Sequence, residues 1–195
     1  MRQSLWMVAA LLTACGPEAM TEPAGVDDSL HEDLRFLREE EKLAHDVYVA
    51  LQNRWSLQSF GNIASSEQTH TEAVLGLLTA IGIDDPVAGK GAGQFENATL
   101  QQLYTDLVAK GSASQVDALT VGATIEDLDL SDLERFSAKT ARADVRAVYD
   151  TLARGSRNHL RSYVGQLSGA YQPQFISRAT YDGILATPTE RGGGH

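Results

Sequence analysis

The stretch Ile63–Ile81, IASSEQTHTEAVLGLLTAI, predicts a helix that turns one face inward along its whole length. Its inward positions recur in alternating steps of four and three residues, as in a helix packed inside a bundle. These positions are Ile63, Glu67, His70, Val74, Leu77 and Ile81. Glu67 and His70 project from this face about one turn apart. A buried carboxylate and imidazole are costly unless something compensates both, and a bound metal ion does so.

A helix before this stretch shows the same pattern. We expect it to begin at Ser29, the first residue of a Ser-x-x-Glu capping box. Glu41 is the single charge on its inward face, whereas Glu39 and Glu40 flank that face and are expected to lie in water. The inward positions are Leu30, Leu34, Leu37, Glu41, Ala44, Tyr48, Leu51 and Trp55.

A third long helix is predicted to open at Ser112, with Ser112 and Gln115 as its capping box. Asp129 lies one turn beyond Glu126, and Ser131 is expected to cap a separate short helix that ends near 138. The inward positions of the third helix are Val116, Leu119, Ala123, Glu126 and Leu130.

A fourth long helix is predicted from about 143 to 167, and its polar inward residues, Ser156 and His159, again lie near the middle. Its inward positions are Val145, Val148, Leu152, Ser156, His159 and Tyr163. The sequence thus predicts an all-α four-helix bundle. A long crossover (83–97) without phosphate-loop spacing joins its halves, and short extra helices are expected at 99–110 and 177–185.

Composition limits the function classes. The chain has 195 residues, 43% of them hydrophobic, which suffices for one domain with a substantial core. With 16 basic and 26 acidic residues the net charge is −10, which argues against nucleic acid as a partner. Cys15 is the single cysteine, so neither a disulfide framework nor a zinc-thiolate site is available.

The first 15 residues, MRQSLWMVAALLTAC, resemble a bacterial lipoprotein signal that leaves Cys15 to be lipidated. Residues 16–28 are rich in Pro, Gly and acidic residues and are expected to form a flexible tether. The bundle is then expected over 29–186 and a disordered tail over 187–195. On this interpretation the protein lies in the bacterial cell envelope, on its periplasmic face or at the cell surface, and contacts the membrane only through its lipid.

The polar residues on the four inward faces indicate a metal site. Three carboxylates and two neutral imidazoles offer oxygen and nitrogen donors suited to Fe, Mn or Zn. Asp129 would bring the negative charges to a number that matches two divalent ions. The alternative is a structural network of buried polar groups without an ion. The predicted ligands are Glu41, Glu67, His70, Glu126, His159 and Asp129.

Four segments carry a resemblance to a known family: EEEKLAHDVY, NIASSEQTH, VGATIEDLDL and GSRNHLRSY. They resemble the "domain of unknown function 2202", an uncharacterised ferritin-like family of bacteria and archaea, and more distantly the rubrerythrin-type di-iron proteins. The resemblance implies a ferritin-like fold and a carboxylate centre with Fe or Mn, two ions or one, that oxidises Fe(II) or reduces peroxide. The matching positions are Glu41, Ala44, Tyr48, Glu67, His70, Glu126 and Asp129.

The fourth helix departs from that pattern, because it has Ser156-x-x-His159 where the rubrerythrin type has Glu-x-x-His. Asp129 replaces the missing carboxylate, water fills its place, or the site holds a single ion. The cysteines of the rubrerythrin iron-sulfur module are also absent. Two hypotheses therefore remain: a di-metal oxidoreductase that uses O2 or peroxide, and a non-catalytic envelope bundle with a structural polar core or structural metal.

Weaker candidates surround the predicted site. Tyr48 and Tyr163 lie on inward faces and either pack or hydrogen-bond to a ligand carboxylate. Ser156 either binds weakly or holds a water. His45 follows Glu41 by four residues and either reaches the edge of the site or, because it lies off the inward face, has the surface role that we expect. The sequence leaves the oligomeric state open.

Overall fold

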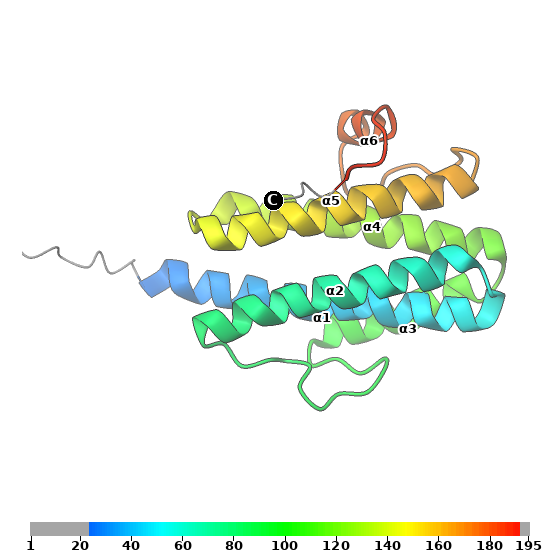
Figure 1. Cartoon of the computed structure of the whole chain (residues 1–195). Helices are drawn as coiled ribbons and strands as arrows, with labels where there is room; N and C mark the ends of the chain where they lie inside the picture. Colours follow the sequence, from blue (N-terminus) through cyan, green and yellow to red (C-terminus); the bar gives the residue numbers. More distant parts are fainter. Residues whose placement is uncertain (1–23, 192–195) are drawn as a thin grey trace, which may run out of the picture.

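The computed structural model of the protein describes residues 24–191, and all the regular secondary structure in this part of the chain is helical (Figure 1). The described residues form four long helices, one shorter helix and one C-terminal helix of eight residues. Their bounds are α1 Ala24–Trp55, α2 Gln58–Ile81, α3 Ala98–Gly111, α4 Gln115–Lys139, α5 Ala143–Gln166 and α6 Arg178–Leu185. The predicted all-α class is confirmed.

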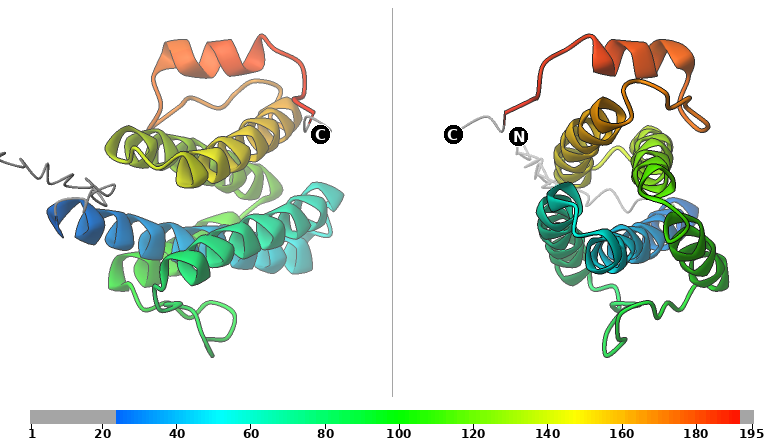
Figure 2. Two further views of the ribbon diagram at one scale, coloured as in Figure 1. Left: turned by 60° about the vertical axis from the view of Figure 1, so that its left-hand side comes forward. Right: turned by 90° about the vertical axis from the view of Figure 1, so that its right-hand side faces the viewer.

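The long helices form a bundle of two antiparallel hairpins, α1–α2 and α4–α5, each with a short connection. The hairpins pack together through α1 against α4 and α2 against α5, as the end-on view in Figure 2 shows. The crossover runs from Gly82, whose positive φ of 85° ends α2, to α3, which lies beside α1 and α4. This is a ferritin-like four-helix arrangement with a long crossover.

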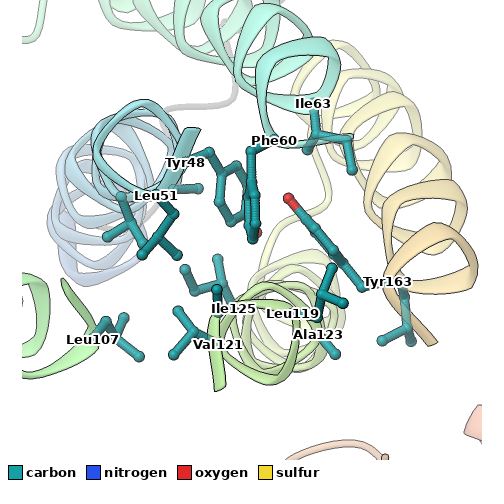
Figure 3. Packing of buried hydrophobic residues seen from close by; sticks show 14 of the residues in the cluster. Tyr48, Leu51, Phe60, Ile63, Leu107, Leu119, Val121, Ala123, Ile125 and Tyr163 are labelled. Atoms are coloured by element: carbon teal, nitrogen blue, oxygen red, sulfur yellow. The ribbon is translucent and has the colours of Figure 1, made fainter. Parts of the chain in front are cut away.

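The core consists of two apolar clusters. The first surrounds Tyr48, Phe60 and Tyr163, whose rings lie 5.4–6.0 Å apart (Figure 3). The second contains Leu34 and Val74, with members from α1, α2, α4 and α5. Along α1, α2 and α5 the predicted polar residues fall between the two clusters, whereas on α4 Leu130 of the first cluster follows them. Each fully buried large apolar side chain contributes roughly 1.5–3 kcal/mol, which offsets the cost of burying polar groups between them.

Helix boundaries differ from the prediction at three starts. α2 begins at Gln58, so the predicted stretch 63–81 starts inside this helix. α1 begins at Ala24, so Ser29 lies within the helix and the last part of the predicted tether is helical. α4 begins at Gln115 with Ser114 as its N-cap, because the Ser114 hydroxyl, and not that of Ser112, accepts the Asp117 N–H at 3.0 Å. Serines close together in the sequence offer equivalent local signals, and only the chain path selects between them.

Two further predictions about α4 were wrong. Ser131 starts no new helix, since α4 continues without a break to Lys139. Val116 was expected to face inward but is 64% exposed, because it lies in the first turn, beyond the reach of the neighbouring helices. Leu119, Ala123, Glu126 and Leu130 are buried as predicted.

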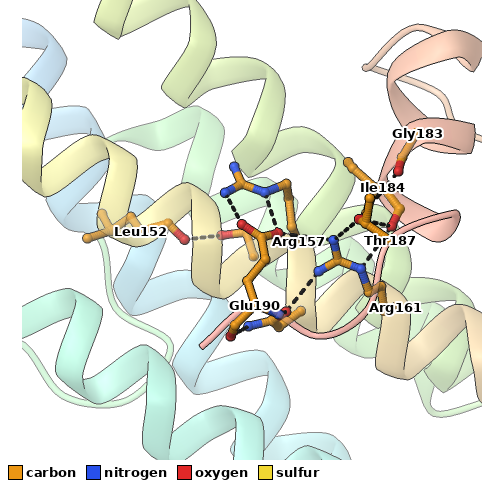
Figure 4. A network of polar contacts seen from close by, with 9 residues as sticks. Leu152, Arg157, Arg161, Gly183, Ile184, Thr187 and Glu190 are labelled. Atoms are coloured by element: carbon orange, nitrogen blue, oxygen red, sulfur yellow. Dashed lines mark hydrogen bonds and ion pairs between the residues drawn. The ribbon is translucent and has the colours of Figure 1, made fainter. Parts of the chain in front are cut away.

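The C-terminal segment is tied to the α4–α5 hairpin at two points. The fully buried Asp127 accepts the hydroxyl of Tyr171 at 2.7 Å and the backbone N–H groups of residues 174–176. Farther on, the carboxylate of Glu190 forms ion pairs with two guanidinium groups of α5, at 2.6 Å from Arg157 and at 3.0 Å from Arg161 (Figure 4). The described part of the predicted tail, 187–191, is therefore held against α5 and is not disordered, whereas 192–195 lie outside the described residues.

Within residues 24–191 the helices are too polar or too short to cross a lipid bilayer. The predicted lipoprotein signal, Cys15 and most of the predicted tether lie outside the described residues.

Candidate metal centre

The predicted ligands meet in the middle of the bundle, in a polar layer between the two apolar clusters. Every long helix supplies at least one of them: α1 brings Glu41, α2 brings Glu67 and His70, α4 brings Glu126, and α5 brings His159. Each is buried, with at most 8% of its surface exposed. The steps of four and three residues place these side chains at one level because each helix presents the same face to the bundle axis.

Two groups of three side chains could hold metal ions, and they share one carboxylate. Glu41, Glu67 and His70 form the first, here called triad A, while Glu67, Glu126 and His159 form the second, triad B. In each triad the potential ligand atoms lie within 4.8 Å of one another. The two oxygens of Glu67 face different triads, since Oε2 lies 2.8 Å from Nδ1 of His70 and Oε1 lies 2.7 Å from Nδ1 of His159.

The outer members of the triads lie slightly farther away. Nδ1 of His70 is 3.3 Å from Oε2 of Glu41, and Nδ1 of His159 is 3.4 Å from Oε2 of Glu126. Yet within the described chain neither Nδ1 atom, nor Oε1 of Glu67, makes a hydrogen bond of acceptable geometry. These atoms are near one another without pointing at one another, as expected of ligands directed at a common point.

In the metal-free centre, the buried carboxylates and imidazoles shift one another's pKa values. Burial alone would lower the pKa of His70, but Glu41 and Glu67 raise it to about 12. Burial likewise opposes the charge on His159, and Glu126 and Glu67 raise its pKa to about 10. The pKa of Glu67 is held below its usual range, because His159 and His70 outweigh its burial. Protonated imidazoles thus supply the positive charge that the buried carboxylates require.

The pKa values of the two outer carboxylates, Glu41 and Glu126, are shifted upward, in the opposite direction from that of Glu67. Burial raises the pKa of Glu41 to about 7, although His70 counteracts this. Burial and the neighbouring Glu67 also raise the pKa of Glu126. Without a cation other than the imidazolium groups, the layer cannot keep all its carboxylates ionised, and a divalent ion would relieve this shortage.

Partners outside the triads fix the orientation of the ligands. Nε2 of His159 lies 3.1 Å from the Ser66 hydroxyl, which leaves Nδ1 free to face the centre. The Tyr48 hydroxyl donates to Oε1 of Glu126 at 2.6 Å, and the Tyr48 ring packs in the first cluster. The Tyr163 ring packs in the first cluster, and its hydroxyl has no hydrogen-bond partner among residues 24–191.

A glycine makes room for one imidazole. A Cβ added at Gly155 on α5 would lie 2.4 Å from Nε2 and 2.5 Å from Cε1 of His70. The ring of His70 therefore packs directly against the α5 backbone, and it stacks on the ring of His159 with 5.6 Å between centroids. Sequence reasoning gave Gly155 no role, because the constraint comes from a side chain on another helix.

Ser156 and Asp129 form a pair of their own. The fully buried Ser156 hydroxyl donates to Oδ2 of Asp129 and also to the Leu152 carbonyl at 3.1 Å. Oδ1 of Asp129 has no hydrogen-bond partner within the described chain, and Asp129 belongs to neither triad. Asp129 thus lies next to the position where a fourth-helix carboxylate was expected, without being brought into the triads themselves.

Two glutamates before Glu41 contradict the prediction, since Glu39 and Glu40 are 4% and 3% exposed and do not lie in water. The crossover covers Glu39, which accepts backbone N–H groups of Glu96 and Asn97. The face of α4 covers Glu40. His45 is half-buried and contacts Asp46 at 3.0 Å, away from the triads, as expected.

The fold and this layer define a class of protein: a helical bundle with buried Glu and His groups that could hold metal ions. The particular family follows from comparison with known sequences. Residues 31–188 match the model of the uncharacterised protein domain DUF2202, and the chain belongs to this family.

Relatives support this assignment. The chain is 50% identical over 170 residues to the uncharacterised protein MJ0754 of Methanocaldococcus jannaschii, covering 86% of this chain and 92% of that protein. It is also similar to the crystal structure of the hypothetical protein MJ0754 from Methanococcus jannaschii DSM 2661. There the TM-score is 0.82 and the identity 46%, over 91% of this chain and 100% of the matched one.

Proposed function

We propose that the protein binds two transition-metal ions, Fe or Mn, one in each triad, with Glu67 bridging them. One observation carries this proposal: the two carboxylate oxygens of Glu67 lie 2.7 and 2.8 Å from the Nδ1 atoms of different imidazoles, and neither Nδ1 atom makes a hydrogen bond within the described chain. Carboxylate oxygen and imidazole nitrogen are a ligand set suited to these metals. The ions would replace the protons that the imidazoles now hold.

The finer proposal is that the centre is an oxidoreductase that oxidises Fe(II) or reduces peroxide. Fe or Mn ions held by the two triads would supply the electrons that reduce O2 or peroxide. The chain itself would bind the ions, keep bulk water out through the apolar clusters on both sides, and hold Glu126 in place through the hydroxyl of Tyr48.

We also propose that the domain is held at the bacterial cell envelope by a lipid on Cys15, as the first 15 residues suggest. A Cys15→Ser variant should then appear in the soluble fraction, whereas the wild-type chain sediments with membranes. Equal sedimentation of the two would remove this part of the proposal and leave the metal centre untouched.

The non-catalytic bundle remains the second candidate, and the ion pairs of the metal-free layer favour it. Protonated His70 and His159 already neutralise part of the carboxylate charge, so the layer is not forced to hold metal for the bundle to fold. Under this proposal a single structural ion, or none, would be bound and no redox chemistry would follow.

Elemental analysis by plasma mass spectrometry separates the two candidates. The full chain, purified without an affinity tag, should hold close to two Fe or Mn per chain, and Glu67→Gln should lose both because the two triads share this residue. Glu72→Gln is the matched control, an exposed glutamate on the same helix, and should keep both ions. No metal after anaerobic Fe(II) loading would refute the metal centre.

Air exposure of the Fe(II)-loaded protein then tests the chemistry. An oxidase or peroxidase centre should develop near-ultraviolet absorption of ferric iron faster than free Fe(II) at the same pH, and Glu67→Gln should not. Two bound ions without any such change would favour the structural role.

A further inference from the structure

Glu40 is a buried carboxylate that lacks a partner. It is 3% exposed, and both its oxygens are shielded from solvent and accept no hydrogen bond from the described part of the chain. Its neighbour Glu39 accepts backbone N–H groups of the crossover, and Glu41 faces His70. Of these three consecutive glutamates, Glu40 is therefore the one with neither a hydrogen-bond donor nor an imidazole beside it in the described chain. A buried carboxylate without a compensating partner is costly to the fold.

The groups around Glu40 are mainly acids. The carboxylates of Asp129, Asp132 and Glu41 surround it. Asp132 has its own cation, because Arg135 lies 2.7 Å away, but Arg135 is half exposed and does not reach Glu40 with a hydrogen bond. Arg135 therefore acts on Glu40 only from a distance, and neither Glu40 nor Oδ1 of Asp129 has a hydrogen-bond donor within residues 24–191.

A small cavity joins these acids to the triads. Its wall is formed by Glu40, Glu41, Ala44, Glu67, Ile125, Glu126 and Asp129. Glu40 and Asp129, which both carry unpartnered oxygens, therefore line the same space as Glu67, the residue that the two triads share. A cation in or beside this space would meet both carboxylates.

The sequence of α5 explains why a carboxylate from elsewhere is needed. Ser156 stands where a fourth-helix carboxylate was expected, and its hydroxyl is engaged with Asp129 and the Leu152 carbonyl. α5 therefore offers His159 alone to the centre. The side of the centre that faces the cavity is instead bordered by acids of α1 and α4.

We propose that Glu40 is a metal ligand of the centre and, with Asp129, supplies on the cavity side the carboxylates that Ser156 does not. This inference rests on the proposed function, because it assigns a further ligand to the same two ions. It also gives the unpartnered Glu40 a reason to be buried, since an ion would compensate its charge.

Co(II) titration of the full chain tests the assignment, because the visible d–d bands of Co(II) respond to the number and kind of its ligands. Glu40→Gln should weaken the binding of one of two Co(II) ions at least about tenfold and change the d–d bands. Asp132→Asn is the matched control: it removes one buried negative charge near Glu40 without removing the proposed ligand, and should leave the d–d bands and the stoichiometry unchanged.

A second variant, Glu40→Asp, keeps the charge but shortens the side chain, so a ligand role predicts changed bands and a purely electrostatic role predicts wild-type binding. Thermal unfolding of the metal-free variants checks that they fold. If Glu40→Gln binds Co(II) like the wild type, or if Glu40→Gln and Asp132→Asn weaken it equally with unchanged bands, Glu40 is no ligand and the two-ion centre still stands. If the wild type binds no Co(II), the proposed function itself fails.

Discussion

Replacing Gly155 by Ala tests how the centre is packed. The added methyl group would lie 2.4 Å from Nε2 of His70, whereas ordinary contacts of a Cβ begin at 3.4 Å, so the imidazole must move by about 1 Å. It has little room to do so, because it stacks on His159 and is flanked by Glu41 and Glu67. Overpacking of this kind costs roughly 1–3 kcal/mol.

A second effect has the opposite sign. Alanine is favoured over glycine inside a helix by about 1 kcal/mol. Gly76, in the interior of α2, is the matched control because a Cβ there would meet nothing within 4 Å. Gly76→Ala should therefore stabilise the metal-free protein by up to about 1 kcal/mol, and Gly155→Ala should be roughly 1–3 kcal/mol less stable than Gly76→Ala.

Urea unfolding of the metal-free variants, followed by circular dichroism, measures this difference directly. The same variants then report on the ligand geometry, since metal sites tolerate shifts of only about 0.2 Å. Gly155→Ala should bind Co(II) at least about tenfold more weakly, on the scale of losing an outer partner, while Gly76→Ala should bind it as the wild type does. Equal stability and equal metal binding of the two variants would refute the packing of His70 against α5.

Three other perturbations have defined outcomes. Tyr48→Phe removes the 2.6 Å hydrogen bond to a buried site carboxylate and should lower the unfolding free energy of the metal-free protein by about 1–3 kcal/mol; a urea titration that shows no loss would contradict this. Asp127→Asn should speed tryptic cleavage within 171–190, because the backbone donors there lose a charged acceptor, whereas the exposed Asp150→Asn should not. Arg157 holds the pKa of Glu190 at about 2, so the stability advantage of the wild type over Glu190→Gln should be complete above about pH 4.5 and disappear as the pH falls toward 2; an advantage independent of pH in chemical unfolding would contradict the ion pair.

The helical period was sufficient to predict the fold class and the five residues of the two triads. A side chain on the inward face of a long helix is buried wherever the helix packs, so Glu67, His70 and their counterparts could be placed from spacing alone. The level at which they meet was also predictable, because each polar interruption lies near the middle of its apolar face.

Other features depend on contacts between distant segments. Glu39 and Glu40 lie off the inward face of α1, and they are buried because the crossover and α4 cover that side of the helix. Asp127 binds residues 174–176, to which no local pattern connects it. The start of α4 was misplaced because Ser112 and Ser114 carry the same capping signal.

The division of ligands between the two hairpins has a consequence for assembly. The α1–α2 hairpin contains all of triad A, whereas the α4–α5 hairpin contains only Glu126 and His159 of triad B and depends on α2 for Glu67. Under the proposed function, the first ion can therefore be captured by one hairpin as soon as it forms, before the other half of the chain has docked. The second ion can bind only after the two hairpins have packed together. Its binding would therefore link the hairpins and indicate that folding is complete.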